Sequence, residues 1–318
     1  MKRRALALWP LAVAAQAQPR PTTPKIGYLH PRTLVDTHPT LMILRQAWRK
    51  LGYVEGQTLL MRSANGDAAK LPALTQQLID EGVAALIVVG ASAVRAASLT
   101  TKSVPIVAID LETDPVRAGY AASYAKPGGN VTGLFLDQPA LAGKWIDLLR
   151  ETVPGIERLA ILWDPSTGAN QLEVARTVAR SRGFEAVVLE VHRMANVDQG
   201  LRHLAGRPRT GMVQLSSPGA SLLTPALAAA ALRYQLPLIS FLRAYAESGV
   251  LMTYGPVQET YFARAVPVAD RLARGQRAGD TPIEGPDRFE FVINLKTARA
   301  MGLTLPPAVL LRADEVIR

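Results

Sequence analysis

The stretch VPIVAIDLETDPVRAGYAASYAKPGGNVTGLFL, residues 104–136, begins and ends with a short apolar run. Residues 104–109 and 131–136 are rich in β-branched side chains, which is typical of strands buried on both faces. Asp110, Glu112 and Asp114 place three carboxyl groups on the loop after the first run, and Asp114-Pro115 is typical of a helix start. Because ligands of open α/β sheets bind outside the carboxyl ends of strands, we predict that this loop edges a binding site. The alternative, that Asp110 and Asp114 only cap backbone groups, stays open.

The same alternation of apolar runs and amphipathic helical stretches fills both halves of the chain. Each half has five predicted strands: 25–29, 58–62, 83–89, 104–109 and 131–136 in the first, and 158–163, 186–191, 212–215, 236–240 and 250–253 in the second. Strands that alternate with helices imply parallel sheets with right-handed crossovers. We therefore predict an α/β fold of two doubly wound parallel-sheet lobes.

The domain organisation follows from the length and from the tail of the chain. A length of 318 residues predicts two domains, and the helix, linker and strand expected beyond residue 256 are too few for a third. The tail must complete the lobes, so we expect three crossings between them. The predicted first lobe is 24–136 plus about 256–293, and the second is 137–255 plus about 294–318. A cleft between facing carboxyl edges follows.

The first residues have the pattern of an export signal. Lys2, Arg3 and Arg4 precede a short apolar run, and Ala15-Gln16-Ala17 fits the small-x-small cleavage rule. We expect residues 1–17 to be a signal peptide cleaved near Ala17. The apolar run is too short to span a bilayer. The absence of cysteine excludes disulfides, a thiol nucleophile and a lipid-modified cysteine.

The basic charge does not indicate a nucleic-acid protein. The formal net charge is +10, or +7 after subtracting Lys2, Arg3 and Arg4, and the remaining basic residues are scattered late in the predicted helices, where they complement the helix dipole. A nucleic-acid site would gather them on one face or tail. We expect no nucleic-acid partner.

Motifs for catalysis, cofactors and metals are missing from the sequence. It has no Gly-x-Ser-x-Gly elbow, no P-loop and no Gly-x-Gly-x-x-Gly. Its four histidines lack zinc-protease spacing, and the acidic loop resembles a calcium loop only at its start. We therefore predict no enzyme, no catalytic residue, no metal site and no cofactor.

Polar residues instead recur where predicted strands end in both halves. They are His30, Arg32, Thr33, Ala91, Ser92, Asp114, Ser166, Thr167, Gly168, Ser216, Ser217 and Tyr254. Several stand at helix starts, whose free N–H groups hold anions. An amino acid would fit, with its carboxylate near Ser92 or Ser217 and its ammonium at Asp114. Taken singly, each serine or threonine is more often just a helix N-cap, but their recurrence at strand ends in both halves favours a site.

Several motifs in order resemble one known family. They are LGYVEGQ at 51–57, DPV at 114–116, KPGGNVTG at 126–133, YGP at 254–256, VINLKTA at 292–298 and RADEV at 312–316. They resemble the substrate-binding proteins of ABC importers, in the group that includes tryptophan-binding lipoproteins. The resemblance implies a type I periplasmic-binding-protein fold with three crossings, a ligand held in the cleft, and hinge closure. It also implies a periplasmic, monomeric protein that serves a membrane permease and its ATPase.

The resemblance also implies positions for the ligand, and the sequence departs from the family at some of them. The family's loops map to 30–33, 90–92, Asp114, Asp164 and 216–217. Relatives often have a small first loop, whereas His30 and Arg32 add bulk and charge, and Asp164 stands where relatives often have Asn. These changes argue against an aromatic amino acid and leave room for a more acidic ligand. Two other functions stay open: a sensory binding module that docks on a receptor, and an exported α/β enzyme.

Overall fold

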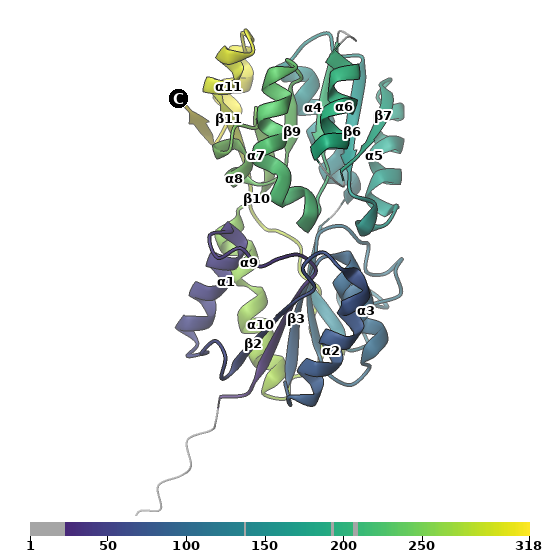
Figure 1. Cartoon of the computed structure of the whole chain (residues 1–318), viewed down its shortest axis with the longest axis vertical. Coiled ribbons are helices and arrows are strands. Elements are labelled where there is room, and N and C mark those ends of the chain that lie inside the picture. Colours follow the sequence, from purple (N-terminus) through teal and green to yellow (C-terminus); the bar gives the residue numbers. More distant parts are fainter. Residues whose placement is uncertain (1–22, 137, 192–193, 206–208) are drawn as a thin grey trace, which may run out of the picture.

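The computed structural model of the chain describes residues 23–136, 138–191, 194–205 and 209–318. Residues 1–17, expected to be a signal peptide, lie outside the described residues. The chain forms two lobes stacked along the long axis of the molecule, each built around one sheet (Figure 1). No helix in the described ranges has the length and apolar character that a membrane span requires.

The first lobe is built on a parallel sheet with the strand order β2-β1-β3-β4-β5. Its described strands are β1 (Ile26–His30), β2 (Leu59–Ser63), β3 (Ala85–Val89), β4 (Ile106–Asp110) and β5 (Val131–Phe135). Every residue of β3 and β4 is buried, which confirms the prediction from their continuous apolar runs. Such runs suit strands that are covered on both faces.

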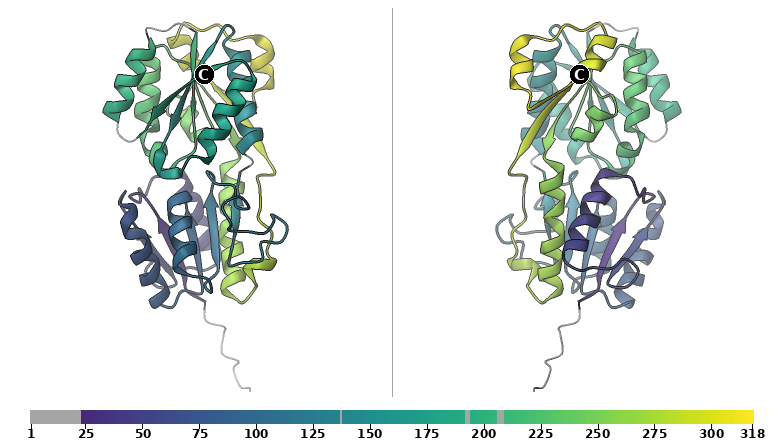
Figure 2. Two further views of the ribbon diagram at one scale, coloured as in Figure 1. Left: turned by 90° about the vertical axis from the view of Figure 1, so that its right-hand side faces the viewer. Right: turned by 90° about the vertical axis from the view of Figure 1, so that its left-hand side faces the viewer.

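Helices cover both faces of this sheet (Figure 2). They are α1 (Pro39–Lys50), α2 (Leu71–Asp80), α3 (Ala91–Thr100), α9 (Gln258–Ala263) and α10 (Ala265–Ala273). On one face, Leu44 and Trp48 of α1 pack in the core cluster that contains Tyr28. On the other, α2 and α3 pack in a second cluster. The sheet is therefore doubly wound, as predicted.

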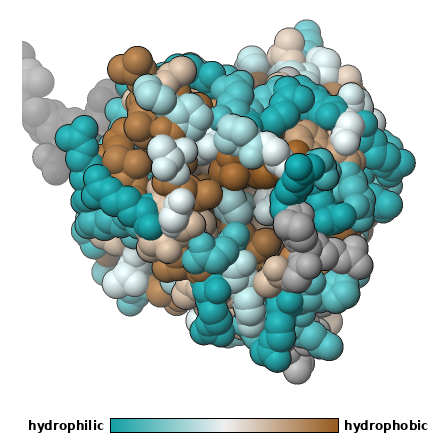
Figure 3. Space-filling model, turned by 90° about the horizontal axis from the view of Figure 1, so that it is seen from above, coloured by the Kyte–Doolittle hydropathy of each residue, from teal (hydrophilic) through white to brown (hydrophobic). Residues whose placement is uncertain are grey.

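The second lobe is built on a sheet with the order β12-β11-β10-β9-β8-β6-β7. Its described strands are β6 (Arg158–Trp163), β7 (Glu185–Glu190), β8 (Thr210–Gln214), β9 (Leu238–Ser240), β10 (Met252–Pro256), β11 (Phe289–Asn294) and β12 (Glu315–Ile317). The helices are α4 (Gln138–Thr152), α5 (Asn170–Ser181), α6 (Met194–Ala205), α7 (Pro218–Arg233), α8 (Arg243–Glu247), α11 (Leu295–Ala300) and α12 (Pro307–Arg312). Seen from above, hydrophobic residues gather toward one side of this lobe's outer end and hydrophilic ones cover the other (Figure 3).

Two details differ from the sequence prediction. Strand β11 pairs antiparallel with β10, so residues 289–294 belong to the sheet of the second lobe, whereas 289–293 were assigned to the first. The assignment was wrong because an apolar run does not show which strand it pairs with. Residues 115–119 form turns instead of a helix. Asp114 Oδ1 accepts the N–H groups of Val116 and Arg117, as a cap would, but Gly119 adopts φ +74° and the helix does not continue.

Along the described residues, the chain passes between the lobes three times. It does so between β5 and α4, between β10 and α9, and between residue 284 and β11. The last connection runs along the outside of the molecule (Figure 2). The carboxyl ends of the parallel strands of both sheets consequently face one another across the space between the lobes, as the sequence predicts.

Candidate functional site

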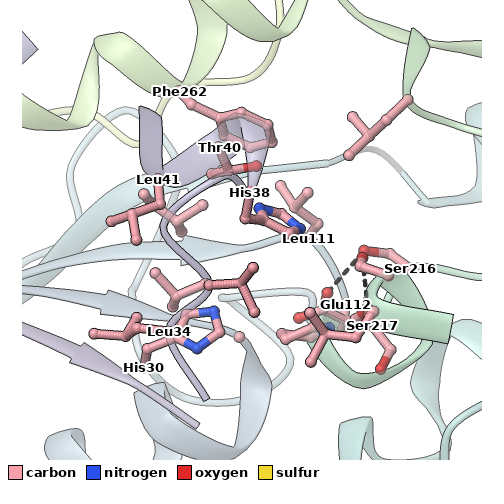
Figure 4. Close-up of a pocket in the computed structure, with 18 of the residues that line it drawn as sticks. His30, Leu34, His38, Thr40, Leu41, Leu111, Glu112, Ser216, Ser217 and Phe262 are labelled. Atoms are coloured by element: carbon pink, nitrogen blue, oxygen red, sulfur yellow. Dashed lines mark hydrogen bonds between the residues drawn. The ribbon is translucent and has the colours of Figure 1, made fainter. Parts of the chain in front are cut away.

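A cavity of about 60 Å³ lies between the lobes (Figure 4). The first lobe contributes β1 and the loop after it, the start of α1, the N-cap of α3, the loop after β4, and α9. The second lobe contributes the loop after β8, the start of α7 and the loop after β9. Much of the lining is apolar, and its polar members are His30, Thr33, His38, Thr40, Glu112, Ser216, Ser217 and Ser221. Pockets of this kind, apolar with a few polar groups, are typical of small-molecule sites.

Glu112 joins the two lobes at the polar end of the cavity. The hydroxyl of Ser216 donates to Glu112 Oε1 at 2.7 Å, and the N–H of Ala91 donates to Oε2 at 3.1 Å. Glu112 thereby connects the loop after β4, the start of α3 and the loop after β8. Its exposure is 2%, so these bonds lie out of water.

A second contact between the lobes lies beside the cavity. Arg32 Nη2 is 3.1 Å from Asp164 Oδ2 and 3.3 Å from Ser166 Oγ. Asp164 also accepts from the Ser217 hydroxyl at 2.5 Å. The Asp164 side chain is 1% exposed and that of Arg32 is 30% exposed. The guanidinium of Arg32 is therefore bound to the second lobe.

The cavity has acidic and neutral groups on its walls. Burial raises the pKa of Glu112 well above its usual value, and the nearby charge of Asp110 raises it further. Burial also raises the pKa of Asp110, which is 0% exposed. Burial lowers the pKa of His30 to about 4 and lowers that of His38, so both imidazoles are neutral at pH 7. Among the described lining residues there is no lysine or arginine.

The structure brings some of the sequence-predicted residues to the cavity. His30, Thr33, Ser216 and Ser217 line it, and Ala91 donates its N–H to Glu112. Their contact with a ligand remains a prediction.

Other sequence-predicted residues lie elsewhere. Arg32, Asp164 and Ser166 bind one another beside the cavity, and Ser92 is outside its lining. Asp114 lines a separate hollow with Arg117, Asn170 and Glu173. The ring of Tyr254 stacks on Phe289, with centroids 5.5 Å apart.

Several wall residues are not predicted from the sequence. Glu112 was noted on the acidic loop but not chosen as a candidate. Leu34, Leu41 and Phe262 are apolar residues that have the pattern of ordinary core, so nothing in the sequence marks them as pocket walls. The one available signal was that Glu112 precedes the Asp-Pro turn on a loop after a buried strand.

The comparisons with known proteins agree with this architecture. The model of the family described as ABC transporter substrate binding protein matches residues 39–317. A tyrosine-binding protein of Clostridioides difficile is 24% identical over 278 residues, which cover 84% of this chain and 78% of the relative.

Solved structures show the same fold. A domain from Streptococcus pneumoniae in complex with L-Trp has a TM-score of 0.81 at 21% identity, covering 93% of this chain and 100% of that one. A conserved domain protein from Vibrio cholerae has a TM-score of 0.81 at 23% identity, covering 92% and 99%. The ligand-free, open structure of a substrate-binding protein with adhesive properties from Clostridium difficile has a TM-score of 0.62 at 21% identity, covering 92% and 99%. With the family model matched from residue 39 to 317 on this two-lobed fold, the chain belongs to the ABC transporter substrate binding protein family.

Proposed function

We propose that this chain captures a small solute in the cleft between its lobes for uptake by an ABC importer. The observation that carries the proposal is the cavity lined by loops from both lobes. The contacts Glu112–Ser216 and Arg32–Asp164 join the lobes on its border. A cavity bordered in this way forms when the lobes close and is lost when they separate.

Closure by hinge bending is the step that we assign to the three connections between the lobes. A few residues at the ends of elements can absorb the rotation, as in other two-domain binding proteins. A ligand that contacts both lobes favours the closed arrangement by the difference between its affinities for the two states. The lobes therefore separate in the ligand-free protein and close on the solute.

The solute that the cavity favours has an apolar body and a polar head. Its walls include Leu41, Leu111 and Phe241, whereas Glu112 and Ser216 form a polar end. Relatives named for tyrosine and L-Trp support a solute of the amino-acid class or a related compound. The expected preference for an acidic ligand receives no support from Arg32, because its guanidinium binds Asp164.

The proposed setting is the periplasm. The signal pattern of residues 1–17 supports export, and the family supports delivery to a membrane permease and its ATPase. We propose that the chain acts as a monomer and binds its solute without converting it.

A solute screen tests the proposal. Thermal unfolding of the chain without its predicted signal peptide is measured in the presence of amino acids, amines, carboxylates, sugars and nucleobases. X-ray scattering is then recorded with each solute that raises the unfolding temperature, called a hit below. A solute at 100 times its dissociation constant should stabilise the fold by about 2.7 kcal/mol and reduce the radius of gyration. Ser221→Phe, which fills the cavity, should abolish the hit, and Ser248→Phe on the surface of the same lobe should keep it. A hit that leaves the shape unchanged, or that is turned over, contradicts the proposal.

A further inference from the structure

We propose that the cleft selects an amine, a ligand with a protonated amino group, a small apolar body and no carboxylate, and that the amino group binds at Glu112. This inference rests on the proposed function and names the class of solute. It differs from the amino-acid expectation because an amino acid also needs a cation or free N–H donors for its carboxylate, in addition to a subsite for its amino group.

The subsite for the amino group is the carboxyl of Glu112, which interacts with the buried carboxyl of Asp110. Glu112 lines the cavity and points toward Ser216 of the opposite lobe (Figure 4). Asp110 does not line the cavity; it is fully buried, and within the described part of the chain its Oδ2 has no hydrogen-bond partner. A buried carboxylate is costly unless a cation or donors compensate it. A ligand ammonium supplies both charge and donors.

The walls offer no cation to a ligand carboxylate. Of the described residues around the cavity, none is lysine or arginine. Arg32, the basic residue on the loop after β1, is bound to Asp164 and Ser166. His30 is neutral at pH 7, since burial lowers its pKa to about 4. A ligand carboxylate would therefore be buried beside Glu112 without a positive partner, which is unfavourable.

The helix starts that usually hold anions are also occupied. At the start of α3, the Ala91 N–H donates to Glu112. The adjacent Gly90 lies close against the second lobe, since a Cβ placed on it would be 2.7 Å from Pro218 Cγ. At the start of α7, Ser217 Oγ accepts the N–H groups of Gly219 and Ala220 at 2.9 and 3.1 Å. Glu112 thus takes the place at α3 that a ligand carboxylate would otherwise take.

The size of the cavity favours a compact body. Its volume is about 60 Å³, whereas a cavity of about 150 Å³ is known to hold benzene. A short branched alkyl chain therefore suits this arrangement of the lobes better than an aromatic ring, which requires them to stand further apart.

Binding of the ammonium should release a proton. Asp110 and Tyr245 are the titratable groups whose charges interact with Glu112. Because burial and mutual repulsion raise the pKa of the carboxyl pair, the pair holds a proton that a bound cation displaces into solvent. The apparent binding enthalpy should then differ between buffers of different ionisation enthalpy.

Two matched sets of ligands test the inference on the wild-type protein. The first is 3-methylbutylamine, leucine and 4-methylpentanoate; the second is phenethylamine, phenylalanine and 3-phenylpropanoate. Within each set the body is constant and only the charged groups change. Within each set, we expect the amine to bind at least tenfold more tightly than the amino acid and the acid to bind most weakly. We also expect 3-methylbutylamine to bind more tightly than phenethylamine.

A pair of variants locates the subsite. Glu112→Gln should weaken amine binding roughly tenfold to a hundredfold, the value of a hydrogen bond between charged groups. Glu290→Gln should leave it unchanged; Glu290 is another carboxyl whose pKa burial raises, but it lies on β11 away from the cavity. If Glu112→Gln fails to fold, the ligand sets on the wild-type chain still decide.

The outcomes separate this inference from the proposed function. Tighter binding of leucine or phenylalanine than of their amines overturns the amine inference and leaves capture of a solute intact. Tighter binding of 4-methylpentanoate or 3-phenylpropanoate than of the matching amine has the same two consequences. No binding by any of the six also overturns the amine inference, and the wider solute screen then decides on the proposed function.

Discussion

Replacing Arg32 with alanine should shift the equilibrium between the closed and open lobes. The change removes the contact with Asp164 at 3.1 Å and with Ser166 at 3.3 Å. An exposed ion pair contributes about 0.2–1 kcal/mol, and a hydrogen bond to a charged group about 1.5–3 kcal/mol. The Asp164 side chain is 1% exposed but that of Arg32 is 30% exposed, so we expect about 1.5 kcal/mol. The ratio of closed to open molecules should then fall about tenfold.

The assay uses the absence of native cysteine. Two cysteines introduced at exposed positions, Leu99 on α3 and Leu311 on α12, accept a pair of dyes, one on each lobe. Energy transfer between the dyes reports the separation of the lobes. A saturating ligand should close both proteins, while half-saturation of Arg32→Ala should need about tenfold more ligand, because a smaller fraction is competent to bind.

The control for Arg32→Ala is Arg158→Ala. Arg158 forms an ion pair with Glu185 inside the second lobe, so its loss should leave the separation of the lobes unchanged. The reasoning is refuted if Arg32→Ala leaves both the transfer efficiency and the ligand titration as in the wild type, or if Arg158→Ala alters them equally.

Two further predictions concern stability. The pKa of Glu112 is raised above its usual 4.5 in the folded chain, so the folded state keeps a proton that the unfolded state releases. The free energy of unfolding should therefore fall as pH rises above about 4.5. Urea titrations at several pH values measure this dependence, and Glu112→Gln should make it flatter. Gly133→Ala should lower the free energy of unfolding by roughly 3 kcal/mol or more, because φ is +135° and the new Cβ would lie 2.1 Å from the Ala108 carbonyl oxygen. Gly155→Ala, at φ +89° with no atom within 4 Å, should cost about 1–2 kcal/mol, and equal losses in the two variants would contradict the steric argument.

The strands and helices of the core were predictable because burial imposes a local pattern. Continuous apolar runs such as β3 and the spacing of Leu41, Leu44 and Trp48 on α1 follow from the period of each element. Strand pairing was not predictable in the same way. β11 joins β10 antiparallel, and the choice between two neighbouring sheets depends on where the chain returns after its third crossing.

The candidate site was predictable to the level of loops, but less so for individual side chains. The carboxyl ends of parallel strands must share an edge, so His30, Ser216 and Ser217 were found from the order of the elements alone. Asp114 was chosen for its charge, yet it lines a separate hollow. Glu112 lines the cavity instead, because the backbone between β4 and the turn directs these two carboxyl groups to different places.

The sequence by itself determined the family, the two-lobed α/β architecture and several of the strand ends that line the cavity. These depend on periodicity and on motifs that are continuous in the chain. The tertiary structure decided which groups face one another across the cleft. Arg32 reaches Asp164 over 132 positions of sequence, and Glu112 reaches Ser216 over 104. No local pattern fixes such pairs, because their distances depend on how two separately folded lobes meet.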